Sequence, residues 1–111
     1  MPAGRTSRTR NMIGEIVQRI VAEYAPERII LFGSYAHGRP RRHSDIDLLI
    51  VKDTDMRPIE RWTHLKRLLR DRSRTVSVSP IVYTPGELAD RLAAGDFFVK
   101  EIVEEGVVLY G

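Results

Sequence analysis

Two aspartates stand at the start of an apolar segment near the middle of the chain. Asp45 and Asp47 lie two residues apart, and Asp47 is followed directly by the apolar run 48–51. In an extended strand, residues two apart project to the same side of the sheet. Two carboxylates at such a short distance repel each other unless a cation neutralises their charge. Mg²⁺ favours carboxylate oxygens and shares itself with substrate phosphates, so the pair predicts metal-assisted phosphoryl-type chemistry. The alternative is two ordinary surface aspartates where a strand begins.

A second candidate is the Gly33-Ser34 pair, which directly follows the apolar run 29–32. A glycine at the end of a strand lets the backbone approach a phosphate closely, and the N–H groups after it can point at the anion. The Ser34 hydroxyl would add a further donor. A strand followed by Gly-Ser is common, so this pair by itself favours a plain turn.

The apolar periodicity predicts the elements that position these residues. In the first half of the chain, apolar steps of three and four predict a helix over 12–24, which Pro26 ends. The apolar runs 29–32 and 48–51 predict buried strands over 28–32 and 45–51, the second covered on both faces. A short helical turn is expected over 34–38, before an arginine-rich loop.

The second half begins with a helix expected from Pro58 to about Arg72, followed by a strand from Thr75 to Tyr83. Pro80 cannot donate to a sheet ladder, which places this strand at an edge or a bulge. We expect the apolar stripe of this helix to face the core and to consist of Ile59, Trp62, Leu65, Leu68 and Leu69. Arg61 and the other basic residues are expected on other parts of the helix surface. The remaining elements are a capped helix over 85–94, a helix after Asp96 carrying Phe98, Ile102 and Val103, and a strand over 107–110.

This element order predicts an α/β (α+β) fold, a small mixed sheet flanked by helices. With 111 residues, the chain is expected to form one domain over 11–111 after a flexible basic N-terminus, residues 1–10. Cysteine is absent, which excludes a disulfide framework, a thiolate zinc site and a cysteine nucleophile. No apolar run approaches the length of a membrane span and no signal sequence is evident, so a cytoplasmic location is expected.

Charge is distributed unevenly along the chain. Residues 1–74 hold 16 basic and 9 acidic side chains, whereas residues 75–111 hold 2 basic and 6 acidic ones. The basic front favours an anionic partner, either a nucleotide, a nucleic acid or an acidic protein surface, or it is simply a solvated face. A nucleic acid is the least favoured of these, because the aspartate pair would repel its phosphates unless a metal intervened.

Taken together, Gly33-Ser34 and the later Ser44-Asp45-Ile46-Asp47 on a hydrophobic strand resemble the nucleotidyltransferase superfamily. The chain looks most like its smallest members, the minimal nucleotidyltransferase (MNT) domains, often the antitoxin half of a HEPN–MNT pair. The resemblance extends from the first helix to the closing EEGVVLY. It implies the fold of the DNA polymerase β palm, a small mixed sheet flanked by helices.

The resemblance also implies roles for individual residues. Gly33 and Ser34 match the residues that hold the triphosphate, and Asp45 and Asp47 match the two carboxylates that bind the metal, Mg²⁺. The implied reaction is attack of a hydroxyl on the α-phosphorus of ATP, with pyrophosphate leaving. In toxin–antitoxin members, the acceptor is a tyrosine of the HEPN partner, which becomes adenylylated and inactive.

Two positions depart from the family pattern. The first is Ala36-His37-Gly38, where the family usually has Ala-Arg-Gly. His37 could still donate to a phosphate, and the neighbouring Arg39, Arg41 or Arg42 could substitute for the missing arginine. His43, beside Ser44, is a further residue that could touch substrate.

The second departure is Ser79, which occupies the position of the family's third carboxylate. That carboxylate is the usual proton acceptor, and general-base help is worth roughly 10²–10⁴-fold in rate. The chain could therefore be a slow enzyme, borrow a base from a partner, or be a non-catalytic antitoxin that binds Mg-ATP or docks. The apolar C-terminal segment could complete the core or pair with a second copy in a homo-oligomer.

Overall fold

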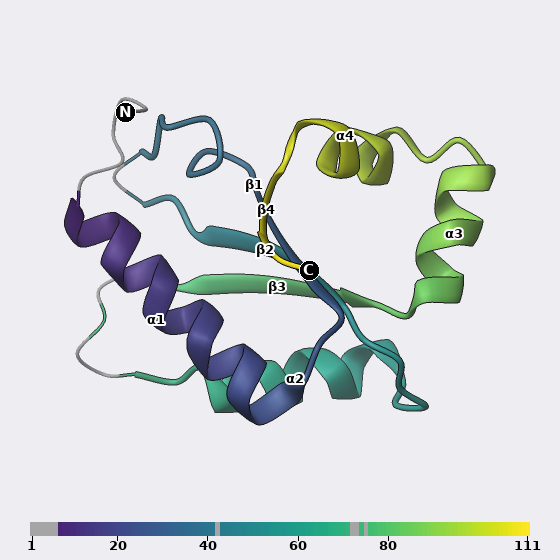
Figure 1. Ribbon diagram of the computed structural model, residues 1–111, viewed down its shortest axis with the longest axis horizontal. Coiled ribbons are helices and arrows are strands. Elements are labelled where there is room, and N and C mark those ends of the chain that lie inside the picture. Colours follow the sequence, from purple (N-terminus) through teal and green to yellow (C-terminus); the bar gives the residue numbers. More distant parts are fainter. Residues whose placement is uncertain (1–6, 42, 72–73, 75) are drawn as a thin grey trace.

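The computed structural model describes residues 7–41, 43–71, 74 and 76–111. Its helices and strands follow the predicted order along the chain (Figure 1). They are α1 (Ser7–Tyr24), β1 (Arg28–Phe32), β2 (Ile46–Val51), α2 (Pro58–Leu68), β3 (Val78–Tyr83), α3 (Pro85–Ala93), α4 (Phe97–Glu105) and β4 (Val107–Tyr110).

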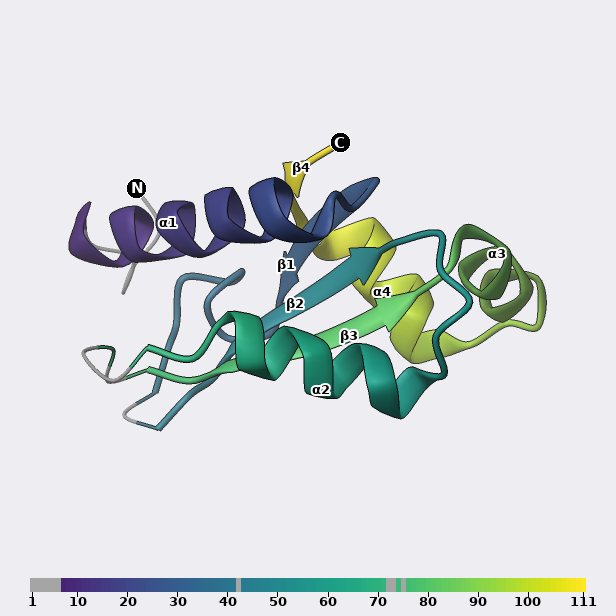
Figure 2. The same ribbon diagram turned by 90° about the horizontal axis from the view of Figure 1, so that it is seen from below.

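The four strands form one mixed sheet, as the sequence predicts, and their order across it is β3-β2-β1-β4. β1 runs antiparallel to both β2 and β4, whereas β2 and β3 run parallel, side by side in Figure 2. Pro80 lies in β3 at an edge of the sheet, which confirms the expectation drawn from its missing N–H. β4 pairs with β1 of the same chain, so the C-terminal segment completes this sheet.

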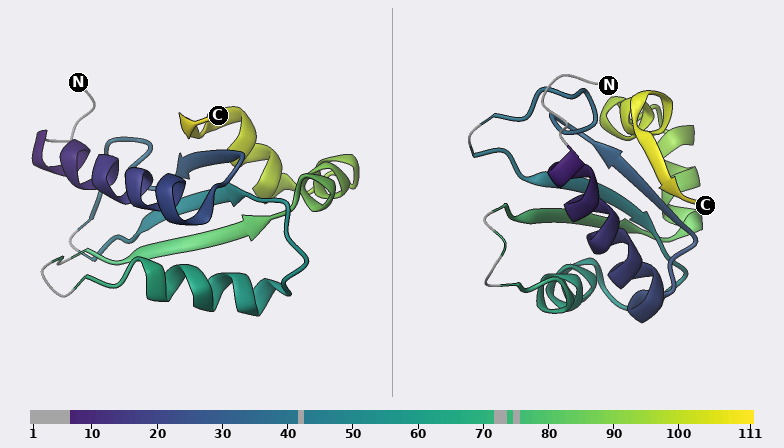
Figure 3. Two further views of the ribbon diagram at one scale, coloured as in Figure 1. Left: turned by 60° about the horizontal axis from the view of Figure 1, so that its bottom comes forward. Right: turned by 60° about the vertical axis from the view of Figure 1, so that its left-hand side comes forward.

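Helices cover the sheet on both faces (Figure 3). Leu48 and Ile50 of β2 are buried in a cluster with α1 and α2, whereas Leu49 and Val51 are buried in a cluster with α3 and α4. Successive strand residues point to opposite faces, so a strand between two helical layers must be apolar on both. This confirms the doubly covered strand predicted from the unbroken apolar run.

The N-terminal helix begins earlier than its apolar pattern indicates. α1 starts at Ser7, so residues 7–10 are helical although they were expected within the flexible N-terminus. Residues 1–6 lie outside the described part of the chain. The first apolar side chain that α1 buries is Ile13, so the preceding turns have no apolar pattern to reveal them. None of the helices described is long and apolar enough to cross a membrane.

The orientation of α2 differs from the prediction. Arg61 is buried, with 4% of its surface exposed, whereas Trp62 and Ile59 are 46% and 62% exposed. Leu65 is buried on the α1–α2 side as expected. α2 ends at Leu68, and the predicted boundaries at Arg72 and Thr75 lie outside the described residues.

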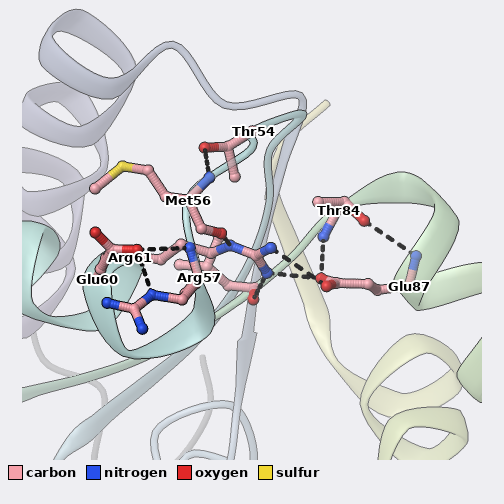
Figure 4. A network of polar contacts seen from close by, with 8 residues as sticks. Thr54, Met56, Arg57, Glu60, Arg61, Thr84 and Glu87 are labelled. Carbon is pink, nitrogen blue, oxygen red and sulfur yellow. Dashed lines mark hydrogen bonds and ion pairs between the residues drawn. The ribbon is translucent and has the colours of Figure 1, made fainter.

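Arg61 can be buried because protein groups satisfy its guanidinium (Figure 4). Nη1 and Nη2 donate to the two carboxylate oxygens of Glu87 at 2.6 and 3.2 Å. Nε donates to the Met56 carbonyl at 2.7 Å, and Nη1 also donates to the Val82 carbonyl at 3.2 Å. Glu87 in turn accepts from the Thr84 backbone N–H at 2.9 Å. This junction, Arg61–Glu87, joins α2 to the start of α3.

The last helix presents only part of its predicted apolar face to the core. Val99 and Ile102 are buried, but Phe98 is half exposed and packs edge-on against Phe32, with ring centroids 5.7 Å apart. Gly106 then lies against β1, where a Cβ would collide with Ile30 and with the Ile102 carbonyl. The C-terminal end of α4 is thereby fixed close to the end of β1.

Candidate active site

The register of the sheet places Asp47 between two neighbouring strand residues. Asp47 is opposite Phe32 of β1 on one side and beside Ser79 of β3 on the other. Asp45 stands one residue before β2, where the sequence predicted it within the strand. The site therefore lies at the end of the sheet where β1 finishes and β2 and β3 begin.

Gly33 brings the phosphate-loop candidate against the carboxylates. Its φ is +75°, and a Cβ built there would collide with Oδ2 of Asp47. Glycine meets both requirements because it has no Cβ and adopts positive φ freely. The turn after β1 and the carboxylate of Asp47 are consequently in direct contact.

The turn itself uses only some of its N–H groups. Ala36 and His37 donate to the Gly33 carbonyl at 3.1 and 3.3 Å, and Arg39 donates to the Ser34 carbonyl at 2.9 Å. The backbone N–H groups of Ser34 and Tyr35 donate to no acceptor in the described part of the chain. Successive free N–H groups in a turn form the kind of concavity that binds anions.

The electrostatics of the aspartates differ from those of isolated side chains. Burial raises the pKa of Asp47, and the negative charge of Asp45 raises that pKa further. The pKa of Tyr35 is raised by burial and then by Asp45. On the other side, the Ser77 hydroxyl donates to Oδ1 of Asp45 at 2.5 Å. Asp47 thus carries a negative charge that the fold disfavours and that a bound cation would stabilise.

A cavity of about 490 Å³ opens over these residues. The residues from the sheet and the turn after β1 include Gly33, Asp47 and Ser79, and α4 supplies a further part of the lining. Ser34, Arg39 and Asp45 are not among its lining residues. The full lining is Phe32, Gly33, Ala36, His37, Asp47, Ser79, Ile81, Phe98, Glu101, Ile102, Glu105 and Gly106.

The residues present fit a divalent cation that shares its coordination with substrate. Over the described ranges, no group of three or more histidine, cysteine or acidic side chains is spaced to hold a metal ion. Asp45 and Asp47 offer two carboxylates, and Ser79 adds no charge beside them. Mg²⁺ commonly uses one or two protein carboxylates and takes its other ligands from water and substrate phosphates.

The other predicted residues lie in the loop between the turn after β1 and the start of β2. Arg39, Arg41 and His43 are exposed, and Arg42 lies outside the described residues. Of the basic candidates in the loop, only His37 lines the cavity among the residues described. His37 therefore has better access to a ligand there than Arg39 does.

Sequence reasoning missed the contribution of α4. Glu101 and Glu105 line the cavity together with Phe98, which was expected in the core. Their spacing of four residues places both carboxylates on one helix face and is visible in the sequence. The sequence does not show that this face would meet the strand ends carrying Asp47 and Ser79, because that depends on how α4 crosses the sheet.

Comparisons with known proteins agree with this arrangement. The family model described as "Polymerase beta, Nucleotidyltransferase" matches residues 15–111. "Putative protein adenylyltransferase MJ1305" of Methanocaldococcus jannaschii is 32% identical over 84 residues, covering 71% of this chain and 57% of the relative. The chain thus spans little more than half the length of that relative. "Putative protein adenylyltransferase MJ0604" of the same organism is 39% identical over 101 residues, covering 88% of this chain and 94% of the relative.

A solved structure shares the fold. The crystal structure of "a putative nucleotidyltransferase from Sulfolobus solfataricus" superimposes with a TM-score of 0.60 and 28% sequence identity. The match covers 91% of this chain and 78% of that one. The likeness therefore extends over most of the fold.

Proposed function

The chain belongs to the polymerase β nucleotidyltransferase family, and on that premise we propose that it transfers AMP from ATP to a hydroxyl group. The single observation that carries the proposal is the contact between Gly33 and Asp47. This contact places a turn with free N–H groups next to a carboxylate that can bind a cation. A metal-bound triphosphate needs both, because its phosphate oxygens require donors and its metal ion requires a carboxylate ligand.

In the proposed complex, the N–H groups after Gly33 and the Ser34 hydroxyl hold phosphate oxygens. Asp45 and Asp47 would hold Mg²⁺, and the ion would supply positive charge to offset that of the phosphates. The acceptor oxygen forms a bond to the α-phosphorus, and the bond from that phosphorus to the pyrophosphate oxygen breaks. Pyrophosphate leaves with the electron pair. The protein contributes mainly by positioning these groups and by electrostatics, as is usual in phosphoryl-type transfer.

His37 and Arg39 are proposed as additional phosphate contacts. His37 has the stronger support, since it lines the cavity with Gly33 and Asp47. Arg39 is exposed, and its backbone N–H closes the turn by donating to the Ser34 carbonyl. Its side chain could reach a phosphate from outside the turn. It would then take the role of the arginine that the family usually has at the position of His37.

We propose a protein hydroxyl as the acceptor, specifically a tyrosine of a HEPN-domain partner, which makes the chain an antitoxin. Two relatives are named as protein adenylyltransferases, which supports a protein acceptor. The HEPN partner and the antitoxin role rest on the resemblance to MNT domains, whose motif residues are Gly33, Ser34, Asp45 and Asp47.

A second candidate function is favoured by Ser79. Because β3 places a serine rather than a carboxylate beside Asp47, the same fold could bind Mg-ATP or dock on a toxin without transferring AMP. In that case neutralisation would depend on binding affinity, and the aspartate pair would serve only to hold the nucleotide.

Intact-mass spectrometry distinguishes the two functions. A candidate HEPN-domain partner protein is incubated with the chain, ATP and Mg²⁺, and an Asp45→Asn, Asp47→Asn double variant serves as control. Gain of one AMP that depends on both aspartates supports the transferase. Tight binding of the two proteins without any added mass rejects transfer and supports the docking function.

A further inference from the structure

The site lacks an evident proton acceptor on the sheet. Transfer to a hydroxyl requires that the acceptor's proton leave as its oxygen bonds to phosphorus. Ser79 stands beside Asp47, and from Val76 to Gly86 the chain contains no aspartate or glutamate. A serine hydroxyl cannot accept this proton unaided, so another group near the cavity must do so if the transfer is to be fast.

We propose that Glu101 of α4 is this proton acceptor, an inference that rests on the function proposed above. Glu101 lines the same cavity as Asp47 and Ser79, and it belongs to α4 whereas they belong to the sheet. An acceptor hydroxyl that enters the cavity would therefore lie between the carboxylates of the strand and that of the helix. The hydroxyl proton passes to the Glu101 carboxylate while the oxygen–phosphorus bond forms and pyrophosphate leaves.

The course of α4 favours Glu101 over Glu105, the other carboxylate in the lining. α4 follows α3, which packs near β3, and ends at Gly106 against β1 (Figure 1). Glu105 is the last residue of the helix and directly precedes Gly106, which lies against β1. Glu101 is one turn earlier in the helix, between Phe98 and Glu105 on the helix face that lines the cavity.

The side chain of Glu101 is also free for this role. Glu101 forms no ion pair or hydrogen bond with any residue the structure describes, whereas Glu60 and Glu87 are each held by an arginine. Asp45, Asp47 and Glu101 do not meet the spacing of a metal-binding group. Glu101 is accordingly proposed as a base that acts on the acceptor, and not as a third metal ligand.

α4 also provides a matched control. Glu104 belongs to the same helix and is exposed, but it does not line the cavity. Glu101→Gln and Glu104→Gln remove the same charge from neighbouring positions and differ in access to the site. Ser79→Asp places a carboxylate beside Asp47 by substitution and should make Glu101 dispensable.

The experiment measures single-turnover AMP transfer to the HEPN-domain acceptor at saturating Mg-ATP, with ATP affinity measured separately by calorimetry. We expect Glu101→Gln to slow transfer by roughly 10²–10⁴-fold, the usual worth of a general base, with the Kd for ATP unchanged. Glu104→Gln should stay within about twofold of the wild-type rate. Adding Ser79→Asp to Glu101→Gln should recover at least about tenfold of the lost rate.

Several outcomes would overturn the assignment. It is wrong if Glu101→Gln transfers at the wild-type rate, if Glu104→Gln is equally slow, or if Ser79→Asp rescues nothing. A loss confined to Glu105→Gln or His37→Asn would assign the role to that residue instead. If wild type binds ATP but transfers no AMP, the proposed function fails and Glu101 loses its role with it. An active wild type with an unaffected Glu101→Gln variant rejects Glu101 alone.

Discussion

Charged groups lie at both ends of the parallel strands β2 and β3. The fold shifts the carboxyl pKa values in opposite directions at the two ends. At the end where β3 finishes, Glu87 meets a buried arginine, and the hydrogen bonds from Arg61 and then from Thr84 lower the pKa of Glu87. At the end where β2 begins, burial and Asp45 raise the pKa of Asp47. One end satisfies its charges within the fold, and the other leaves a negative charge that a ligand must satisfy.

This difference separates a structural charge from a functional one. Four hydrogen bonds to protein groups hold the guanidinium of Arg61, so removing Glu87 leaves a buried cation without its counter-ion. Such breakage is costly, because an uncompensated buried charge cannot be solvated. Asp47 has the reverse character, since removing its charge relieves the folded protein while depriving the site of a ligand for Mg²⁺.

The largest expected effect comes from Asp47→Asn. Loss of the charge should lower AMP transfer by at least about a thousandfold, since metal stabilisation of transition-state charge is worth several kcal/mol. The same substitution should increase the free energy of unfolding, because the folded state disfavours the ionised Asp47. Transfer is measured by intact mass and stability by urea titration. A variant that is both inactive and less stable than wild type would contradict the contrast drawn here.

The next effect tests the other end of the sheet. Arg61→Met should destabilise the protein by about 1–3 kcal/mol, because the Val82 carbonyl loses its buried donor while Glu87, 40% exposed, remains partly solvated. Arg57→Met is the matched control, since Arg57 pairs with Glu60 at 3.0 Å on the surface and should cost less than about 1 kcal/mol. Urea denaturation measures both. If the two variants lost the same free energy of unfolding, burial would not determine how much each ion pair contributes to stability.

Two glycines with nearly the same φ isolate the contact at the site. Gly33 and Gly95 have φ of +75° and +77°, but a Cβ at Gly95 would meet only open space. Gly95→Ala should cost about 1–2 kcal/mol from the backbone alone, and Gly33→Ala should cost more because of Asp47. Thermal unfolding of both variants measures the difference. That difference should shrink in an Asp47→Ala background, and its persistence there would refute the proposed collision.

The smallest effect is the dependence of stability on pH. The folded pKa of Glu87 is lowered, so its stabilisation is present above the unfolded pKa and is lost as pH falls through the folded pKa. The folded pKa of Asp47 is raised. Its ionisation therefore reduces stability as the pH rises from the unfolded pKa of Asp47 through its folded pKa. Urea titrations from about pH 3 to 7 should show opposite trends when wild type is compared with Glu87→Gln and with Asp47→Asn. Parallel trends would remove the contrast between the two ends.

The sequence predicted most of the fold because apolar periodicity and breaking residues are local signals. The strands on either side of the site, the capped helix at Thr84 and the edge position of Pro80 all follow from neighbouring residues. The rotation of α2 did not, since Trp62 appeared to belong to the apolar stripe and Arg61 to solvent. The partners of Arg61 include Val82 and Glu87, more than twenty residues away, and no local pattern shows them.

The site divides in the same way. The residues at the ends of β1 and β2 lie in one continuous motif, so their types and spacing could be interpreted from the sequence. The pairing of Asp47 with Ser79 requires the parallel register, and the approach of Glu101 requires the path of α4 across the sheet. These are tertiary properties, which a pattern of side-chain types does not encode locally.

Pro80 also affects how this sheet can associate with other chains. A sheet edge is a template on which further strands add through backbone hydrogen bonds, and edges therefore carry a risk of aggregation. β3 forms one edge, and Pro80 leaves it without a donor in the middle of the strand. β4 forms the other edge, and none of its residues from Val107 to Tyr110 is a proline. Growth of the sheet by strand addition is therefore directed to β4 and away from the strand that carries Ser79.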